Sequence, residues 1–310
     1  MLFAVAILVN PYAHPDTWRG LFAELLPDET LWYWPECPDP AEVEMLIAWR
    51  MRRTDLATFT NLTHILSMGA GTEQWQKDGS PEAMIVRLSD PNMGDEMAAY
   101  ALHWVTHFQR GFNVPFSPDA LDAWGGRDIP TPPEYPVGVL GFGSIGSRVG
   151  RAFQDLGYPV NAWTRQGTDA SGVTSYAGTE ELVAFLHASR AVVNVLPDTE
   201  LTRGLLDAER FAQFGGAVFV NIGRGTVVAS EDDLVAAVNR GEVGAAALDV
   251  TSPEPPDAAS PLFGHDRIVI TPHIAGTTQA RSAAALIAAY VQRIRAGDVP
   301  SPVVDPESGY

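Results

Sequence analysis

The chain has 310 residues, of which 46% are hydrophobic and 19% charged, and its formal net charge is −18. This length and composition predict a soluble protein of two domains, each with its own core. The negative charge argues against nucleic acid or an anionic membrane as a partner, so an anionic ligand must be attracted by local positive groups.

The first part of the chain alternates short apolar runs with helical patterns. Residues 2–9 are apolar but too short to cross a bilayer, and they lack the charged leader of a secretory signal, so we interpret them as a buried strand. The sole cysteine, Cys37, allows no internal disulfide and fits a cytoplasmic protein. A helix is expected over 18–26. Further strands are expected over 30–34, 45–49, 64–67 and 84–87, which predicts a small parallel sheet.

A long helix is expected over 93–110, followed by an excursion over 111–136 that is rich in Pro, Gly and Asp and has one short helical stretch over 119–124. His103 and His107 lie four residues apart on the long helix, which is the spacing of a metal pair. No third ligand is evident nearby in the sequence. We therefore expect these histidines to pack at an interface and predict no metal site.

A glycine cluster over 141–146 follows a short apolar run and opens a helical pattern. Gly141 would permit a tight turn, Gly143 would let the backbone approach a pyrophosphate, and Gly146 would let the helix pack closely on the sheet. The N–H groups of the helix that begins near Ser144 would face the phosphates. The pattern predicts a dinucleotide site.

The strand and helix alternation then continues to the end of the chain, with strands that are apolar throughout. Such strands, with helices between them, predict a doubly wound parallel sheet covered on both faces. The expected strands are 137–140, 159–163, 191–196, 217–222, 244–250 and 267–271, and the expected helices are 144–156, 179–188, 207–214, 230–240 and 277–296.

Three polar residues follow three of these strands. Arg224 lies on a glycine-flanked turn after 217–222, Glu254 lies in a proline-rich loop after 244–250, and His273 follows 267–271. Each has an ordinary alternative, as a surface arginine, a loop carboxylate or a structural histidine. Together they are expected to converge at the carboxyl edge of the sheet, where ligands of such sheets bind. Arginine would bind a carboxylate, histidine would move a proton, and glutamate would orient the imidazole and favour its charged form, which points to hydride transfer onto a 2-oxo acid.

At these residues the chain resembles the D-isomer-specific 2-hydroxyacid dehydrogenases, and within them the glyoxylate and hydroxypyruvate reductases. The resemblance covers nearly the whole chain. The motifs that carry it are Gly141-Phe142-Gly143-Ser144-Ile145-Gly146, Leu196-Pro197-Asp198-Thr199, Asn221-Ile222-Gly223-Arg224-Gly225, Leu248-Asp249-Val250 with Glu254-Pro255, and Thr271-Pro272-His273-Ile274-Ala275.

The resemblance implies two doubly wound parallel-sheet domains. A Rossmann coenzyme domain over 93–283 would be inserted into a smaller, flavodoxin-like substrate domain made of 1–92 and 284–310, and the protein would be a homodimer with 93–110 near the interface. Arg224, Glu254 and His273 would be the catalytic residues, and Asp249 would meet the nicotinamide carboxamide. The other implied coenzyme contacts are Gly141, Gly143, Ser144, Ile145, Leu196, Pro197, Thr199 and Ile222, and the implied substrate contacts are Trp49, Met68, Gly69, Ala70, Gly71, Arg224 and His273.

The residues that follow the strand over 159–163 indicate whether the coenzyme is NADH or NADPH. An NAD enzyme normally has an acidic residue here, but this chain has Thr164-Arg165-Gln166 and no acid before Asp169. Since a hydroxyl and a guanidinium would bind a 2′-phosphate, we predict NADPH over NADH, with NADH still possible.

Two other functions stay open at this point. The first is a dehydrogenase for larger 2-oxo acids, because Thr72-Glu73 replaces the usual Val-Asp after the glycine turn, and because Trp49, Trp75 and Trp124 suit either a small or a large pocket. The second is a nucleotide-sensing protein of the same fold without turnover. The complete set of Arg224, Glu254 and His273 argues against a sensor.

Overall fold

The computed structural model describes residues 4–8, 15–49, 51–72, 75, 82–112 and 128–305. Glu73, Trp124 and the short helix expected over 119–124 lie outside these residues. The chain divides into two compact units, one formed by residues 1–92 with 278–310 and the other by residues 93–277. The second segment of this unit begins at 278 and not at the expected 284, and Ala283, which the prediction placed in the other domain, is buried in the core of the first unit.

The first unit is built on a parallel sheet with the strand order β2-β1-β3-β4-β5, which is the flavodoxin order. The predicted fold of this part is therefore confirmed. Its strands are β1 (Ala4–Leu8), β2 (Thr30–Tyr33), β3 (Val43–Ala48), β4 (His64–Ser67) and β5 (Met84–Val86), and its helices are α1 (Pro15–Leu25), α2 (Arg53–Leu56) and α9 (Ala280–Arg295), with a 3-10 turn η1 (Pro40–Glu42).

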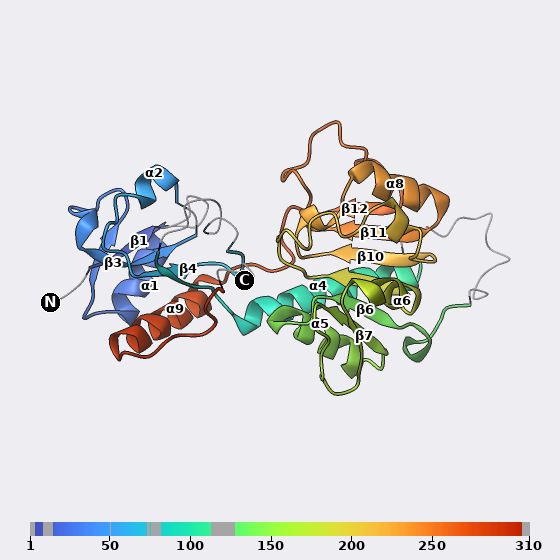
Figure 1. The fold of residues 1–310 in the computed structure, drawn as a ribbon, viewed down its shortest axis with the longest axis horizontal. Helices are drawn as coiled ribbons and strands as arrows, with labels where there is room; N and C mark the ends of the chain where they lie inside the picture. The colour runs from blue at the N-terminus through green and yellow to red at the C-terminus, as the bar shows by residue number, and fades with distance from the viewer. Residues whose placement is uncertain are drawn as a thin grey trace. The chain divides into compact units, whose positions relative to one another are not determined.

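Both faces of this sheet are buried. Along β3, Met45 and Ile47 belong to the cluster that includes residues of α1 and α9, whereas Leu46 and Ala48 belong to a second cluster around Phe59. Figure 1 shows α9 in red lying beside α1 in blue. Because successive strand residues point to opposite faces, an apolar strand of this kind requires cover on both sides.

The second unit contains a seven-stranded parallel sheet with the order β12-β11-β10-β9-β6-β7-β8, the doubly wound Rossmann arrangement extended by one strand. The chain leaves β6 on one side for β7 and β8 and returns on the other side as β9, so the topological switch point lies between β6 and β9. The strands are β6 (Val137–Leu140), β7 (Val160–Thr164), β8 (Val173–Ala177), β9 (Ala191–Asn194), β10 (Ala217–Asn221), β11 (Val243–Leu248) and β12 (Ile268–Ile270).

The helices of the second unit follow the expected pattern. They are α4 (Pro91–Gln109), α5 (Ser144–Asp155), α6 (Leu182–His187), α7 (Ala208–Phe211) and α8 (Glu231–Arg240), with 3-10 turns η3 (Pro132–Glu134), η4 (Thr179–Glu181) and η5 (Gly225–Val227). Among the helices that the structure describes, none has the length and apolar character needed to span a bilayer.

Two of the differences from the sequence prediction have a clear physical reason. Strand β8 was not expected, because it lies at the sheet edge, pairs only with β7 and exposes polar residues such as Thr174 and Ser175. Helix α9 begins at Ala280 and not at 277, because the Thr277 N–H and hydroxyl both donate to the Glu96 carboxylate, at 2.8 Å each. This contact holds Thr277 on α4.

Candidate active site

The glycine turn between β6 and α5 has the shape that a dinucleotide requires. Gly141 has φ +90°, and a Cβ at Gly146 would lie 1.9 Å from the Gly141 carbonyl oxygen, so both positions require glycine. A Cβ at Gly143, by contrast, would meet nothing within 4 Å. As the N-cap of α5, Gly143 offers no side chain to the first-turn N–H groups, which therefore suit an anion lying over this open position. The residues present fit a pyrophosphate.

Leu196 connects this turn to the turn that carries Arg224. A Cβ at Gly141 would lie 3.1 Å from the Leu196 side chain, and a Cβ at Gly223 would lie 2.7 Å from the Leu196 carbonyl oxygen. Thr202 holds the next two predicted coenzyme residues, Pro197 and Thr199. Its hydroxyl donates to the Pro197 carbonyl at 2.6 Å and accepts from the Thr199 N–H at 2.9 Å.

Two asparagines that were not singled out as site residues hold the same region together. Asn194 Nδ2 donates to Asn221 Oδ1 at 2.8 Å, which links the ends of β9 and β10. The Ile222 N–H donates to the Asn194 carbonyl at 3.1 Å, and Asn221 Nδ2 donates to the Arg224 carbonyl at 3.1 Å. Both side chains are buried, and polar residues at the ends of apolar strands were the signal for them in the sequence.

The predicted 2′-phosphate contacts lie at the end of β7. The Thr164 hydroxyl donates to the Gly167 carbonyl at 2.9 Å, which closes a short loop. Arg165 in this loop is exposed, and so is Asp169. The loop thus presents a guanidinium to solvent next to a half-buried hydroxyl.

Glu254 and His273 form a direct pair. His273 Nδ1 lies 2.5 Å from Glu254 Oε1, with 46% of the His273 side chain and 41% of the Glu254 side chain exposed. Glu254 follows β11 and His273 follows β12, so the predicted pairing joins two neighbouring strand ends. Because Nδ1 is engaged, Nε2 is the ring nitrogen that remains to act on a substrate.

Arg224 follows β10, the next strand in the sheet, and is half-buried at the start of η5. One guanidinium nitrogen donates to the Gly223 carbonyl at 2.7 Å. Burial raises the pKa of the nearby Asp198. Hydrogen bonds from Arg203 and Thr226, with the charges of Arg203 and Arg224, outweigh burial and leave this pKa below its usual range. The Arg224 charge therefore interacts with the Asp198 carboxylate, which Arg203 and Thr226 hold by hydrogen bonds.

Asp249 is 2% exposed, and its carboxylate accepts three hydrogen bonds from the loop that carries His273. The donors are the Thr271 hydroxyl at 2.5 Å and the N–H groups of Ile274 and Ala275 at 2.8 Å each. A buried charge without such donors would be costly, and each hydrogen bond to a charged group contributes about 1.5–3 kcal/mol. The structure thus gives Asp249 a role in ordering this loop, in addition to the carboxamide contact predicted for it.

The predicted substrate loop of the first unit follows β4. The Trp49 ring packs on its backbone, because a Cβ at Gly69 would lie 2.8 Å from that ring. The Met68 N–H donates to the Ala48 carbonyl at 3.0 Å, and the Gly69 N–H to Ser67 Oγ at 3.4 Å. The N–H groups of Met68 and Gly69, two of the four expected to bind substrate, therefore also bond within the protein.

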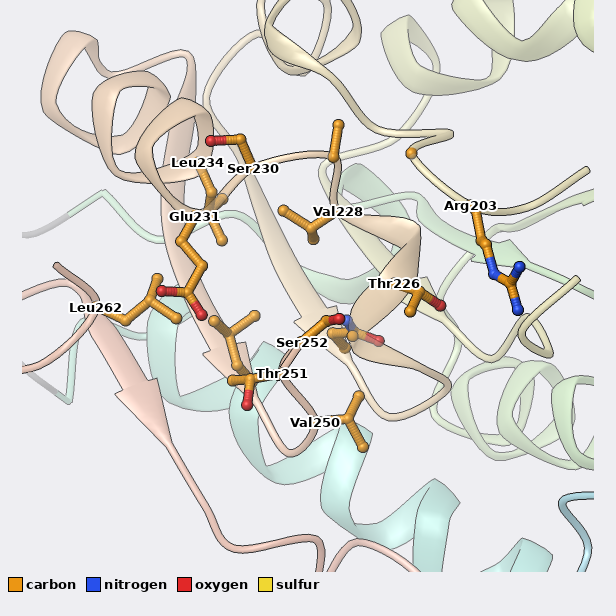
Figure 2. Close-up of a pocket in the computed structure, with 15 residues that line it drawn as sticks. Arg203, Thr226, Val228, Ser230, Glu231, Leu234, Val250, Thr251, Ser252 and Leu262 are labelled. Atoms are coloured by element: carbon orange, nitrogen blue, oxygen red, sulfur yellow. The ribbon is translucent and has the colours of Figure 1, made fainter. Parts of the chain in front are cut away.

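A pocket of about 410 Å³ lies in the second unit. It is lined by Gly225 and Thr226, which follow Arg224, and by Thr251 and Ser252, which precede Glu254. Figure 2 shows the Glu231 carboxylate between Leu262 and Thr251 on its wall. The pocket adjoins both functional loops, but Arg224, Glu254 and His273 are not among its lining residues.

Known proteins are similar to this chain over nearly its whole length. Residues 124–275 match the model of the D-isomer specific 2-hydroxyacid dehydrogenase NAD binding domain. The chain is 32% identical to glyoxylate/hydroxypyruvate reductase A of Serratia proteamaculans, over 98% of this chain and 99% of the relative. It is 33% identical to the protein of the same name from Escherichia fergusonii, over 96% and 99%.

Solved structures show the same relationship. A D-isomer specific 2-hydroxyacid dehydrogenase from Xanthobacter autotrophicus, in complex with NADPH and MES, is 33% identical with a TM-score of 0.90, over 99% of this chain and 100% of that one. An NADPH-dependent glyoxylate/hydroxypyruvate reductase from Sinorhizobium meliloti, in complex with NADP and sulfate, is 25% identical with a TM-score of 0.86, over 99% and 100%. The chain therefore belongs to the D-isomer specific 2-hydroxyacid dehydrogenases and is an NAD(P)-dependent dehydrogenase.

Proposed function

We propose that this protein reduces a small 2-oxo acid, glyoxylate or hydroxypyruvate, to the 2-hydroxy acid at the expense of NADPH. The observation that carries the proposal is the 2.5 Å contact between His273 Nδ1 and Glu254, on the strand ends next to the one that carries Arg224. The names of the relatives support the substrate class.

The side chains divide the chemistry between them. Arg224 binds the substrate carboxylate and polarises the oxygen of the carbonyl group that is reduced. When bound, the reduced nicotinamide supplies the hydride that adds to the carbonyl carbon. His273 Nε2 gives its proton to the alkoxide oxygen, and Glu254 holds the ring through Nδ1 and stabilises its protonated form.

The other roles are assigned by the same proposal. Residues 93–277 form the coenzyme domain, in which Gly141, Gly143, Ser144 and Ile145 cradle the pyrophosphate and Asp249 meets the nicotinamide carboxamide. The coenzyme site is also lined by Leu196, Pro197, Thr199 and Ile222.

The remaining unit is the substrate domain in this proposal. Trp49 and the 68–71 loop contact the substrate there. The backbone N–H groups of Met68, Gly69, Ala70 and Gly71 are proposed to add contacts to the substrate carboxylate.

The function is tested by following NADPH oxidation with a panel of 2-oxo acids of increasing side-chain size. We expect the highest kcat/KM with glyoxylate or hydroxypyruvate. A maximum with bulky acids would instead identify a dehydrogenase for larger substrates. Tight NADPH binding without turnover of any member would identify a nucleotide sensor and contradict the proposal.

The NADPH preference depends on Arg165 in this account. Replacing Arg165 by alanine removes a charged hydrogen bond of about 1.5–3 kcal/mol, so the ratio of kcat/KM for NADPH to that for NADH should fall by about 10- to 100-fold. Arg151→Ala is the matched control, because Arg151 is another exposed arginine of the same unit, paired with Asp155 at 2.8 Å. An unchanged ratio in Arg165→Ala would show that this residue does not bind the coenzyme phosphate.

We further propose a cytoplasmic homodimer with α4 near the interface. The aromatic residues of α4 support the dimer. The rings of Trp104 and Phe108 stack with 5.8 Å between their centroids, and Phe112, just after the end of the helix, is 65% exposed. Light scattering coupled to size exclusion should give twice the mass of one chain. The mass of a single chain would contradict the dimer.

A further inference from the structure

The loop that carries His273 has an unusual backbone, and three of its consecutive N–H groups donate to Asp249. His273 has φ 55°, a left-handed conformation that a side-chain-bearing residue seldom adopts. The His273 N–H donates to the Asp249 carbonyl at 3.0 Å, and the next two N–H groups, of Ile274 and Ala275, donate to the Asp249 carboxylate at 2.8 Å each. The orientation of this carboxylate therefore fixes the orientation of the loop.

A chain of hydroxyl groups leads from this carboxylate to helix α4. The Thr271 hydroxyl donates to Asp249 Oδ1 at 2.5 Å, because a carboxylate only accepts. Its single hydrogen is then used, so in the 2.6 Å contact between Tyr100 and Thr271 the Tyr100 hydroxyl must be the donor. The Trp104 ring lies beside Tyr100 on the same helix, with 6.2 Å between the two ring centroids. The direction of every bond in this chain follows from the charge at its end.

The Tyr100 hydroxyl keeps its proton at neutral pH and can therefore donate. Burial raises its pKa to about 12, the Asp249 charge adds to the effect, and the hydrogen bond to Thr271 opposes it. The hydroxyl is therefore protonated at neutral pH.

Helix α4 also supports the loop by packing. A Cβ at Gly276 would lie 2.6 Å from Met97 Cγ and 3.0 Å from Met93 Cγ, so the loop backbone lies directly on the helix. Met93, Met97 and Tyr100 follow each other at helical spacing and thus share one face of α4. This face contacts the loop at both ends, through Tyr100 at Thr271 and through the methionines at Gly276.

We propose that Tyr100 is a positioning residue for proton transfer, which acts through Thr271 and Asp249 to hold the His273 imidazole in its working orientation. This inference deepens the proposed function and rests on it. It assigns a role in the reaction to a residue of α4 that lies more than 170 positions from His273 in sequence.

Variants of the full-length protein test the role. Tyr100→Phe and Thr271→Val should each lower kcat about 10-fold, because a small displacement of a catalytic group is costly, while KM and the NADPH Kd stay near their wild-type values. Thr271→Ser keeps the hydroxyl and should restore kcat. The double variant that combines Tyr100→Phe with Thr271→Val should lose no more than either single variant, since the two hydroxyls act in one chain.

Tyr158→Phe is the matched control. Tyr158 also donates a hydrogen bond to α4, but its acceptor is Gln109 Oε1 at 2.6 Å and not the His273 loop. This variant should keep the wild-type kcat. A second readout does not depend on turnover: hydrogen exchange of the peptide that spans 271–276, measured without ligands, should be faster in Tyr100→Phe and Thr271→Val but not in Tyr158→Phe.

Unchanged kcat and unchanged exchange in Tyr100→Phe would overturn the inference, and so would an equal loss of kcat in Tyr158→Phe. A wild-type protein that turns over no 2-oxo acid would refute the proposed function instead. In that case the exchange measurement would still decide whether Tyr100 holds the loop.

Discussion

His273 combines a left-handed backbone with a direct contact to the Glu254 carboxylate. Among the described residues it is the one non-glycine position with a positive φ, a conformation that costs of order 1–3 kcal/mol. The hydrogen bonds that three consecutive N–H groups donate to Asp249 offset this cost. Strain of this kind is found where a side chain must be aimed at a reacting atom, which fits the proton-transfer role proposed for His273.

Removing the Glu254 charge tests the pair of Glu254 and His273 most specifically. Glu254→Gln keeps the shape of the side chain but removes the charge that stabilises the protonated imidazole, so kcat/KM should fall about 100-fold. The NADPH Kd should stay unchanged. Steady-state kinetics and a fluorescence titration with NADPH measure the two quantities.

Glu242→Gln provides the control, because Glu242 is a carboxylate of the same unit in an ion pair with Arg240 at 2.7 Å. It should behave like the wild type. If Glu254→Gln also had the wild-type kcat/KM, the pair with His273 would have no part in the reaction.

At the scale of elements, the glycines in the turn between β6 and α5 differ in what requires them. Gly146 is required by packing, since its Cβ would overlap the Gly141 carbonyl. Gly143 is not required by packing, and its φ of −81° suits any residue. Packing therefore does not explain the glycine at this position, whereas the pyrophosphate that we propose to lie over it does.

Gly143→Ala should accordingly leave the fold intact and weaken coenzyme binding. We expect an unchanged Tm and an NADPH Kd that is raised about 10-fold or more, because a methyl group over the open position excludes the pyrophosphate. Gly20→Ala in α1 is the control: a Cβ there also meets nothing within 4 Å, so this change should stabilise the helix without altering the Kd. Equal Kd values in the two variants would place the coenzyme elsewhere.

At the scale of the whole molecule, the sequence predicted what depends on local patterns. The apolar run before Gly141 predicted β6 and the turn, and the strand ends before Glu254 and His273 predicted their pairing. The roles of Asn194, Asn221 and Tyr100 were not predicted, because each depends on a hydrogen bond between residues far apart in the chain. Strand β8 was missed because its exposed edge position removes the apolar signal.

The central claim is that hydride from NADPH and a proton from His273 are delivered to a small 2-oxo acid. Its most direct test is isotope transfer from NADPH that carries deuterium at both C4 positions of the nicotinamide, with glyoxylate as substrate and mass spectrometry of the product. We predict glycolate with one carbon-bound deuterium from the wild type, and formation slowed about 100-fold or more in His273→Ala. Glycolate without deuterium from the wild type, or deuterated glycolate from His273→Ala at the wild-type rate, would contradict the account.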